Sequence, residues 1–184
     1  PIFLVPLLLI VLAACTLFIS QTNFTENIPE EDPTELNKLN NAITKSKFNV
    51  EEGIYELENL KELSGYTEYK KNYILAKLYE NKGENNKAIS TYEKLLNKNY
   101  PLKERVIFHL ANLNIKNGND KKALKFLNKL LHDFPHSKSV PQTKYYLAQT
   151  QFRLKYKIQA LNTLKSLKVE FSDTQYGIGA NYYL

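Results

Sequence analysis

From about residue 36 onward, apolar residues recur with the spacing of amphipathic helices. Ile74, Leu75, Leu78 and Tyr79 occupy positions that share one face of a helix. Gly83 follows this stretch, and helices often end on a glycine because it accepts a positive φ angle. The pattern predicts an all-α protein built from short amphipathic helices.

Three segments repeat one pattern without gaps at their key positions, at residues 72–101, 107–135 and 144–172. Each segment contains a Leu-Ala pair, and a second alanine follows twelve residues after the first. The repeat distance is 35 residues and then 37 residues. The paired alanines are Ala76 with Ala88, Ala111 with Ala123, and Ala148 with Ala160.

Each unit is predicted to be a helix, a short turn and a second helix. Gly83 and Gly118 occupy the turns of the first two units, and Lys155 takes that place in the third. Pro101 and Pro135 are expected to stop the second helices. Methyl groups on two facing helices let the backbones come close, so the alanines predict tight packing within each unit.

A degenerate copy of the unit is predicted at residues 35–68, ahead of the repeats at 69–184. Gly53 lies 35 residues before Ala88, and Asn41 occupies the place of the first alanine. At the other end, Asn181-Tyr182-Tyr183-Leu184 aligns with Lys144-Tyr145-Tyr146-Leu147. The chain is therefore expected to stop, truncated, within the first helix of a further unit.

This pattern resembles the tetratricopeptide repeat (TPR), a unit of about 34 residues with small residues at two fixed positions and a proline near its end. The resemblance implies a right-handed α-solenoid of stacked helix-turn-helix units over about residues 36–184. The tryptophan of the family is absent, because the chain contains no Trp. An ordinary helical bundle remains the alternative.

The resemblance also implies a concave face lined by the first helices. The family's second, fifth and ninth positions correspond to Lys70, Tyr73 and Lys77, to Arg105, Phe108 and Asn112, and to Gln142, Tyr145 and Gln149. Its twelfth and thirteenth positions correspond to Glu80 and Asn81, to Ile115 and Lys116, and to Phe152 and Arg153.

These side chains suit an extended peptide. Tyr73, Phe108 and Tyr145 form an aromatic row that could cover apolar side chains, and Lys77, Asn112 and Gln149 beside it could bond a peptide backbone and its carboxylates. The alternative is that the aromatic rings only fill gaps between neighbouring first helices.

The beginning of the chain predicts export and anchoring. Residues 2–14 contain no charged or polar side chain, and the apolar run continues to Ile19 with one break at Thr16. Leu12-Ala13-Ala14-Cys15 resembles the bacterial lipobox, which implies a signal peptide at residues 1–14, cleavage between Ala14 and Cys15, and lipidation of Cys15. An uncleaved signal anchor is the alternative.

Residues 15–34 are predicted to form a lipidated, flexible tether, because residues 20–34 are polar, acidic and contain two prolines. The expected location is the bacterial cell envelope, facing the periplasm. Thr16 follows the cysteine in place of the aspartate that retains Gram-negative lipoproteins in the inner membrane, which favours the outer membrane.

Charge divides the chain into two parts. Residues 21–68 carry eleven acidic and four basic residues, whereas residues 69–184 carry eight acidic and twenty-one basic residues. A basic half can attract an anionic glycan, a membrane surface or nucleic acid, and export argues against nucleic acid. A lysine-rich solvated surface explains the same composition.

No motif predicts catalysis, a cofactor or a metal site. His132 and His136 have the spacing of two helical metal ligands, but Pro135 between them breaks the helix. The sequence therefore favours a non-catalytic, membrane-anchored TPR scaffold that docks a protein or peptide. The alternative is the N-terminal superhelical region of a peptidoglycan lytic transglycosylase, whose catalytic domain would lie beyond Leu184, and this leaves enzymatic function uncertain. The loose resemblance rests on residues 134–137 and 176–184.

Overall fold

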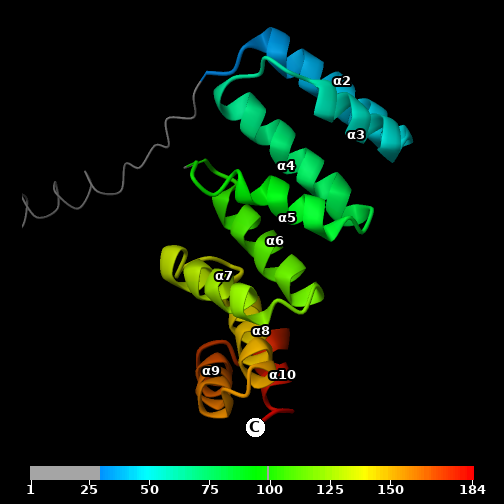
Figure 1. Ribbon diagram of the computed structural model, residues 1–184. Coiled ribbons are helices and arrows are strands. Elements are labelled where there is room, and N and C mark those ends of the chain that lie inside the picture. Colours follow the sequence, from blue (N-terminus) through cyan, green and yellow to red (C-terminus); the bar gives the residue numbers. More distant parts are fainter. Residues whose placement is uncertain (1–29, 99) are drawn as a thin grey trace, which may run out of the picture.

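The computed structural model describes residues 30–98 and 100–184, and every regular element in them is a helix. Within this range the helices pack in chain order into a stack (Figure 1). The nine helices are α2 (Pro33–Phe48), α3 (Val50–Asn59), α4 (Gly65–Asn81), α5 (Asn85–Glu93), α6 (Lys103–Lys116), α7 (Asp120–Asp133), α8 (Val140–Arg153), α9 (Lys157–Glu170) and α10 (Gln175–Ala180).

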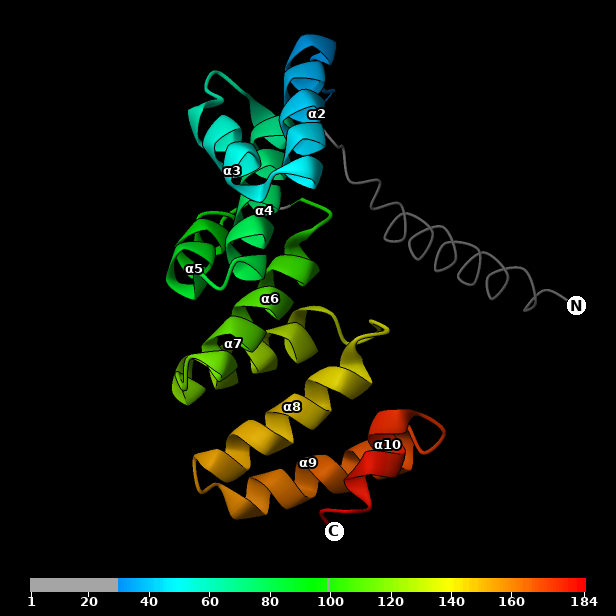
Figure 2. The same cartoon turned by 90° about the vertical axis from the view of Figure 1, so that its right-hand side faces the viewer.

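The helices form four consecutive hairpins, α2–α3, α4–α5, α6–α7 and α8–α9, and each hairpin packs against the next. In Figure 2 the second helices α3, α5 and α7 lie to one side of the first helices α2, α4 and α6. The predicted all-α solenoid of helix-turn-helix units is confirmed.

The predicted alanines lie at the centre of three hairpins. Ala76, Ala88, Ala111, Ala123, Ala148 and Ala160 have no exposed surface. Burial of both alanines of each pair agrees with the prediction that small residues let the two helices of a hairpin approach closely. Protein interiors are close-packed, so larger side chains at these positions would force the helices apart.

The turns of these hairpins use the left-handed backbone conformation. Gly83 has φ +81°, Gly118 has φ +72° and Lys155 has φ +66°. A Cβ atom at either glycine would meet no atom within 4 Å, so the φ angle and not the available space favours glycine. The lysine in the third turn costs roughly 1 kcal/mol relative to glycine.

The first hairpin differs from the others because one residue, Asn49, joins its two helices. The Asn49 N–H donates to the carbonyl of Lys45, and its side chain accepts from the N–H of Glu52 at 3.2 Å. A Cβ atom on Gly53 would lie 2.1 Å from the Cβ of Ser46, so the backbones nearly touch there.

This short connection changes the register of α2. The sequence alignment placed Asn41 at the small-residue position, but Asn41 is exposed and Ala42 is buried. The alignment was wrong there, because one residue joins α2 and α3 whereas three join the helices of the other hairpins, and the residue that meets Gly53 is Ser46.

Helix α2 includes the last two residues of the predicted tether, Pro33 and Thr34. Asp32 caps α2 by accepting from the Thr34 N–H at 2.7 Å, and Pro33 follows at the first position. Glu31 lies 2.7 Å from the Lys70 ammonium of α4. The end of the predicted tether is therefore part of the folded body. Residues 1–29, with Ala14, Cys15 and most of the tether, lie outside the described range.

Helix α5 is shorter than predicted. It ends at Glu93, and the chain continues in tighter turns in which Leu95 and Leu96 donate to the carbonyls three residues earlier. Leu95 is still 97% buried, as its 3% relative exposure shows. The apolar periodicity predicted the burial correctly and the helix end incorrectly.

Helix α10 packs mainly against α9 and also contacts α8. Ala148, Leu164, Leu167 and Ala180 form the apolar cluster at this end of the stack. None of the helices in the described part of the chain combines the length and the apolar character needed to cross a bilayer.

Candidate functional site

The first helices α4, α6 and α8 carry the fifteen groove residues predicted from the sequence. Side chains bridge neighbouring first helices, since Tyr73 of α4 packs on His109 of α6 with ring centroids 6.0 Å apart. Phe108 of α6 packs in the same way on Tyr146 of α8 at 6.3 Å. The three helices, which follow one another down the stack in Figure 2, are therefore linked by side-chain contacts.

Two hollows lie on this face. A cavity of about 460 Å³ between α6 and α8 is lined by Arg105, Phe108 and Gln142 together with neighbouring residues. A second cavity, of about 600 Å³, is lined by Gln149 and Arg153. Phe152 lines the second cavity as well, so six of the fifteen predicted residues line hollows. The other lining residues are Glu104, His109, Ser137, Lys138 and Ser139 in the first cavity, and Tyr182 and Tyr183 in the second.

The rings of the aromatic row fill space between helices and also keep part of their surface exposed. Tyr73, Phe108 and Tyr145 are each partly buried. The Tyr145 ring packs on Tyr176 at 5.7 Å and on Tyr183 at 6.1 Å, so it fills space between α8 and the last residues. The remaining exposed part of each ring faces solvent and is open to a bound segment.

The polar groove residues fall into two groups. Lys70 pairs with Glu31 at 2.7 Å, and Arg153 pairs with Asp120 of α7 at 2.8 Å. By contrast, no hydrogen bond or ion pair joins the Lys77 or Asn112 side chain to another described residue. The polar atoms of these two side chains are therefore open to a partner, as is the exposed guanidinium of Arg105. Gln142 and Gln149 belong to the first group, since they donate to the hydroxyls of Tyr146 at 3.2 Å and Tyr183 at 3.4 Å.

His109 forms a junction that sequence reasoning missed. Its Nδ1 lies 2.8 Å from the Glu80 carboxylate, and this nitrogen carries the hydrogen because a carboxylate only accepts. The ring stacks on Tyr92 of α5, with centroids 5.2 Å apart and planes 6° apart. Its Nε2 lies 3.5 Å from the Tyr73 hydroxyl. One imidazole therefore ties α4 and α5 to α6.

The charge of Glu80 is favoured by this junction. Burial raises the pKa of the Glu80 carboxyl. The hydrogen bond and charge of His109, the charge of Lys116 and the hydrogen bond from the Tyr92 hydroxyl together outweigh burial, so the pKa is lowered overall. The pKa of the Tyr73 phenol is shifted in the other direction. Burial raises this pKa, and the charge of Arg105 only partly opposes the rise. Glu80 is thus an ionised acceptor and Tyr73 a neutral hydroxyl.

The cavity between α6 and α8 has a cationic rim. Its one carboxylate, Glu104, accepts from the Ser139 hydroxyl at 2.8 Å and from the Ser137 hydroxyl, which fixes the turn before α8 against α6. Arg105 and Lys138 are exposed beside it. The cavity can therefore bind a carboxylate or a carbonyl oxygen more readily than a cation.

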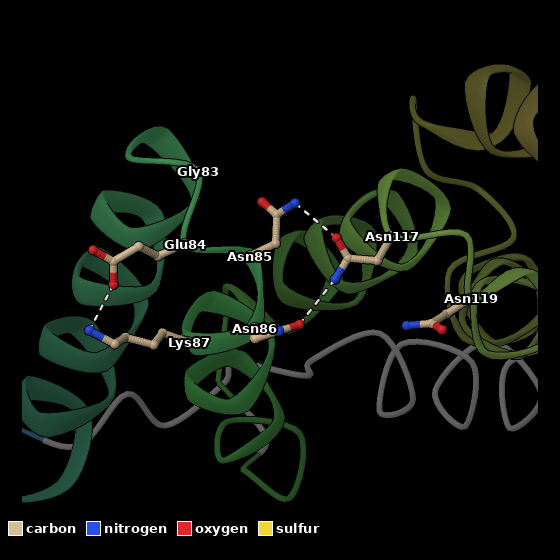
Figure 3. A pocket seen from close by; sticks show the side chains of 7 residues that line it. All are labelled: Gly83, Glu84, Asn85, Asn86, Lys87, Asn117 and Asn119. Carbon is tan, nitrogen blue, oxygen red and sulfur yellow. Dashed lines mark hydrogen bonds and ion pairs between the residues drawn. The ribbon is translucent and has the colours of Figure 1, made fainter.

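A further hollow, of about 670 Å³, lies away from this face, at the turns of the second and third hairpins (Figure 3). Asn85 donates to the Asn117 side-chain oxygen at 2.9 Å, and Asn117 donates to the Asn86 side-chain oxygen at 3.2 Å. Glu84 beside them is neutralised by Lys87 at 2.7 Å. These amides fasten one turn to the next and leave no strong charge for a ligand.

The histidines do not form a metal centre in the part of the chain that the structure describes. There, no three His, Cys, Asp or Glu residues are grouped to hold an ion. His132 lies in the last turn of α7 beside Asp133 at 2.9 Å, and His136 follows the helix end.

Two stretches of the sequence, residues 72–102 and 105–137, match the tetratricopeptide repeat family. They correspond to the hairpins α4–α5 and α6–α7. The matches therefore fall on two of the three segments that carry the alanine pairs. No curated protein sequence matches this chain.

Solved structures show the same fold at low sequence identity. A crystal structure of nearly identical TPR-like repeats from Podosopora anserina has a TM-score of 0.64 at 16% identity, covering 82% of this chain and 84% of that chain. YrrB, described as a TPR protein with an unusual peptide-binding site, has a TM-score of 0.60 at 15% identity, covering 79% and 75%. MamA MSR-1 has a TM-score of 0.58 at 13% identity, covering 83% and 87%.

The Glu80–His109 contact predicts a pH-dependent contribution to stability. Because the folded-state pKa of Glu80 is lowered, this contribution is present above the unfolded pKa and is lost as pH falls through the folded pKa. At about pH 7, Glu80→Gln should lower the free energy of unfolding by about 1–3 kcal/mol, measured by urea denaturation, and the loss should shrink toward about pH 3. Glu93→Gln, an exposed control on α5, should change it by less than about 0.5 kcal/mol. An equal loss for Glu80→Gln at both pH values would contradict this account.

Proposed function

We propose that this chain is a non-catalytic TPR scaffold that docks an extended segment of a protein partner across α4, α6 and α8. The observation that carries the proposal is the pair of hollows on the first-helix face, which contain Arg105, Phe108, Gln142, Gln149 and Arg153. A solenoid offers such a face without a catalytic centre. The likeness in fold to YrrB, a TPR protein with a peptide-binding site, supports the proposal.

The chemistry of the face selects an extended segment. The free Asn112 amide can both donate to and accept from a peptide backbone, and the Lys77 ammonium can bond its carbonyls or carboxylates. Partly exposed rings such as Phe108 can cover an apolar side chain between these polar contacts. Polar groups alternating with rings along three parallel helices suit a strand-like ligand better than a compact small molecule.

We further propose that Cys15 is lipidated and holds the scaffold at a membrane of the bacterial cell envelope, facing the periplasm. The support is the sequence Leu12-Ala13-Ala14-Cys15 at the end of an apolar run. Several buried acyl chains, at about 0.8 kcal/mol per methylene, anchor a protein where one chain would not. The groove would then capture its partner at the membrane surface. The lytic transglycosylase alternative, with peptidoglycan as its substrate, stays a prediction because it rests on a catalytic domain outside these 184 residues.

The docking proposal is tested by Lys77→Ala combined with Asn112→Ala. Neither side chain bonds another described residue, so the double variant should keep the helical circular dichroism and urea midpoint of the parent. A photo-crosslinking residue at Phe108 captures the partner, and a synthetic peptide of the captured segment gives the affinity. We expect the double variant to bind that peptide about tenfold to a hundredfold more weakly.

The matched control is Lys122→Ala combined with Lys125→Ala on α7, a second helix, where both lysines are exposed. This control removes one positive charge more than the groove variant and leaves the groove intact, so its affinity should change less than threefold. Equal affinity of the groove variant and the parent would show that the partner docks elsewhere.

The lipidation proposal is tested by growth of a bacterial host with labelled palmitate. The parent should incorporate label and fractionate with membranes, because the Cys15 thiol accepts the lipid. Cys15→Ser should incorporate none, and since Cys15 is the single cysteine no other thiol can substitute for it. Full labelling of the serine variant would overturn the proposal.

A further inference from the structure

Helix α9 is apolar on two opposite sides. Ala160, Leu164 and Leu167 are buried against the rest of the stack. Ile158 and Val169 lie on the other side, because positions along a helix advance by about 100° per residue. Their relative exposures are 75% and 80%. An ordinary surface helix presents polar residues on the side away from the core.

Comparison with the preceding unit shows that these exposed apolar residues are not a requirement of the repeat. Ile158 lies two residues before Ala160, and the residue two before Ala123 in α7 is Lys121. Val169 lies nine residues after Ala160, and the residue nine after Ala123 is His132. The equivalent positions of α7 are therefore polar, and His132 is fully solvated with 88% of its side chain exposed.

Lysines surround the exposed apolar residues of α9. Lys155, Lys157, Lys165 and Lys168 are all exposed, and the one acidic residue of α9, Glu170 at its end, pairs with Lys144 of α8 at 2.7 Å. Helical spacing places Lys165 between Ile158 and Val169 on the same side. None of the four lysines pairs with a carboxylate within the described ranges. The outer face of α9 thus combines unpaired positive charge with exposed aliphatic side chains.

We propose that the outer face of α9 is a docking surface for an anionic lipid bilayer. Ile158 and Val169 would enter the boundary between headgroups and acyl chains, and the lysine ammonium groups would bind headgroup phosphates. The excess of positive charge selects this partner, because each lysine near an anionic leaflet contributes about fivefold in partition. A neutral apolar partner would gain nothing from the lysines.

This contact goes beyond the groove and needs neither a docked peptide nor a lipid on Cys15. Helix α9 is a second helix, whereas the groove lies on the first helices α4, α6 and α8. In Figure 1, α9 lies at the opposite end of the stack from α2, which follows the predicted tether. Contact through α9 would therefore not use the residues of the groove.

A tryptophan reporter tests the proposal, since the chain has no native Trp. Ile158→Trp in the full, unlipidated chain is mixed with vesicles of phosphatidylcholine alone or of phosphatidylcholine with phosphatidylglycerol. We expect a blue shift of the Trp emission, and quenching by acyl-brominated lipid, only with the anionic vesicles. Lys165→Gln with Lys168→Gln in the reporter background should raise the half-maximal lipid concentration about thirtyfold.

The matched reporter is Lys121→Trp, at the equivalent position of α7, and its emission should not change with either vesicle. The reporters respond to their own surroundings, so binding of the vesicles by residues 1–29 does not mimic the expected result. The proposal is overturned by a silent reporter at Ile158, by an equal response to neutral vesicles, or by an equal response at Lys121. It is also overturned if Ile158→Ser with Val169→Ser abolishes a dimer in solution and leaves vesicle binding unchanged, because the face would then be an interface between copies.

Discussion

The structure depends on the close approach of the two helices within each hairpin. Six alanines with no exposed surface occupy the predicted contact positions of three hairpins, and Ser46 with Gly53 occupies the contact in the first. Small side chains on both helices bring the backbones within packing distance, and leucines and tyrosines around them then fill the core. A thin, regular hairpin can be stacked on the next, which is what produces a solenoid.

Stacking in turn produces the candidate site. No single hairpin makes the groove, because one hollow lies between α6 and α8 and the other is lined by α8 together with Tyr182 and Tyr183. His109 illustrates the coupling, since one ring bonds Glu80, stacks on Tyr92 and approaches Tyr73. The first-helix face is thus held together by contacts between units. The second helices contribute less to these contacts and can differ from unit to unit, as α9 differs from α7.

Much of the fold follows from the sequence because its signals are local and repeated. The alanine spacing predicted the hairpins, and Gly83 and Gly118 predicted turns with positive φ, which the structure confirms. The register of α2 was not predictable from the repeat, because the one-residue connection at Asn49 breaks the period. The early end of α5 was missed because buried Leu95 satisfies the apolar pattern in a tight turn as well as in a helix.

The candidate site was predictable only in part. Periodicity places a residue on the inner side of a first helix, but it does not say whether the side chain is already engaged. Lys70 and Arg153 are held by Glu31 and Asp120, residues 39 and 33 positions away in the chain. Such pairings depend on the superhelical stacking and leave no local signal. The free side chains Lys77 and Asn112 could be separated from the paired ones only with the structure.

The most direct test of close helix approach compares two glycine-to-alanine changes. Alanine is favoured over glycine within a helix by about 1 kcal/mol. At Gly53, however, the new Cβ would lie 2.1 Å from the Ser46 Cβ, whereas at Gly179 the nearest atom is 3.5 Å away. Urea unfolding should therefore show a loss of about 1–3 kcal/mol for Gly53→Ala and no loss for Gly179→Ala. A Gly53→Ala protein as stable as the parent would contradict the account.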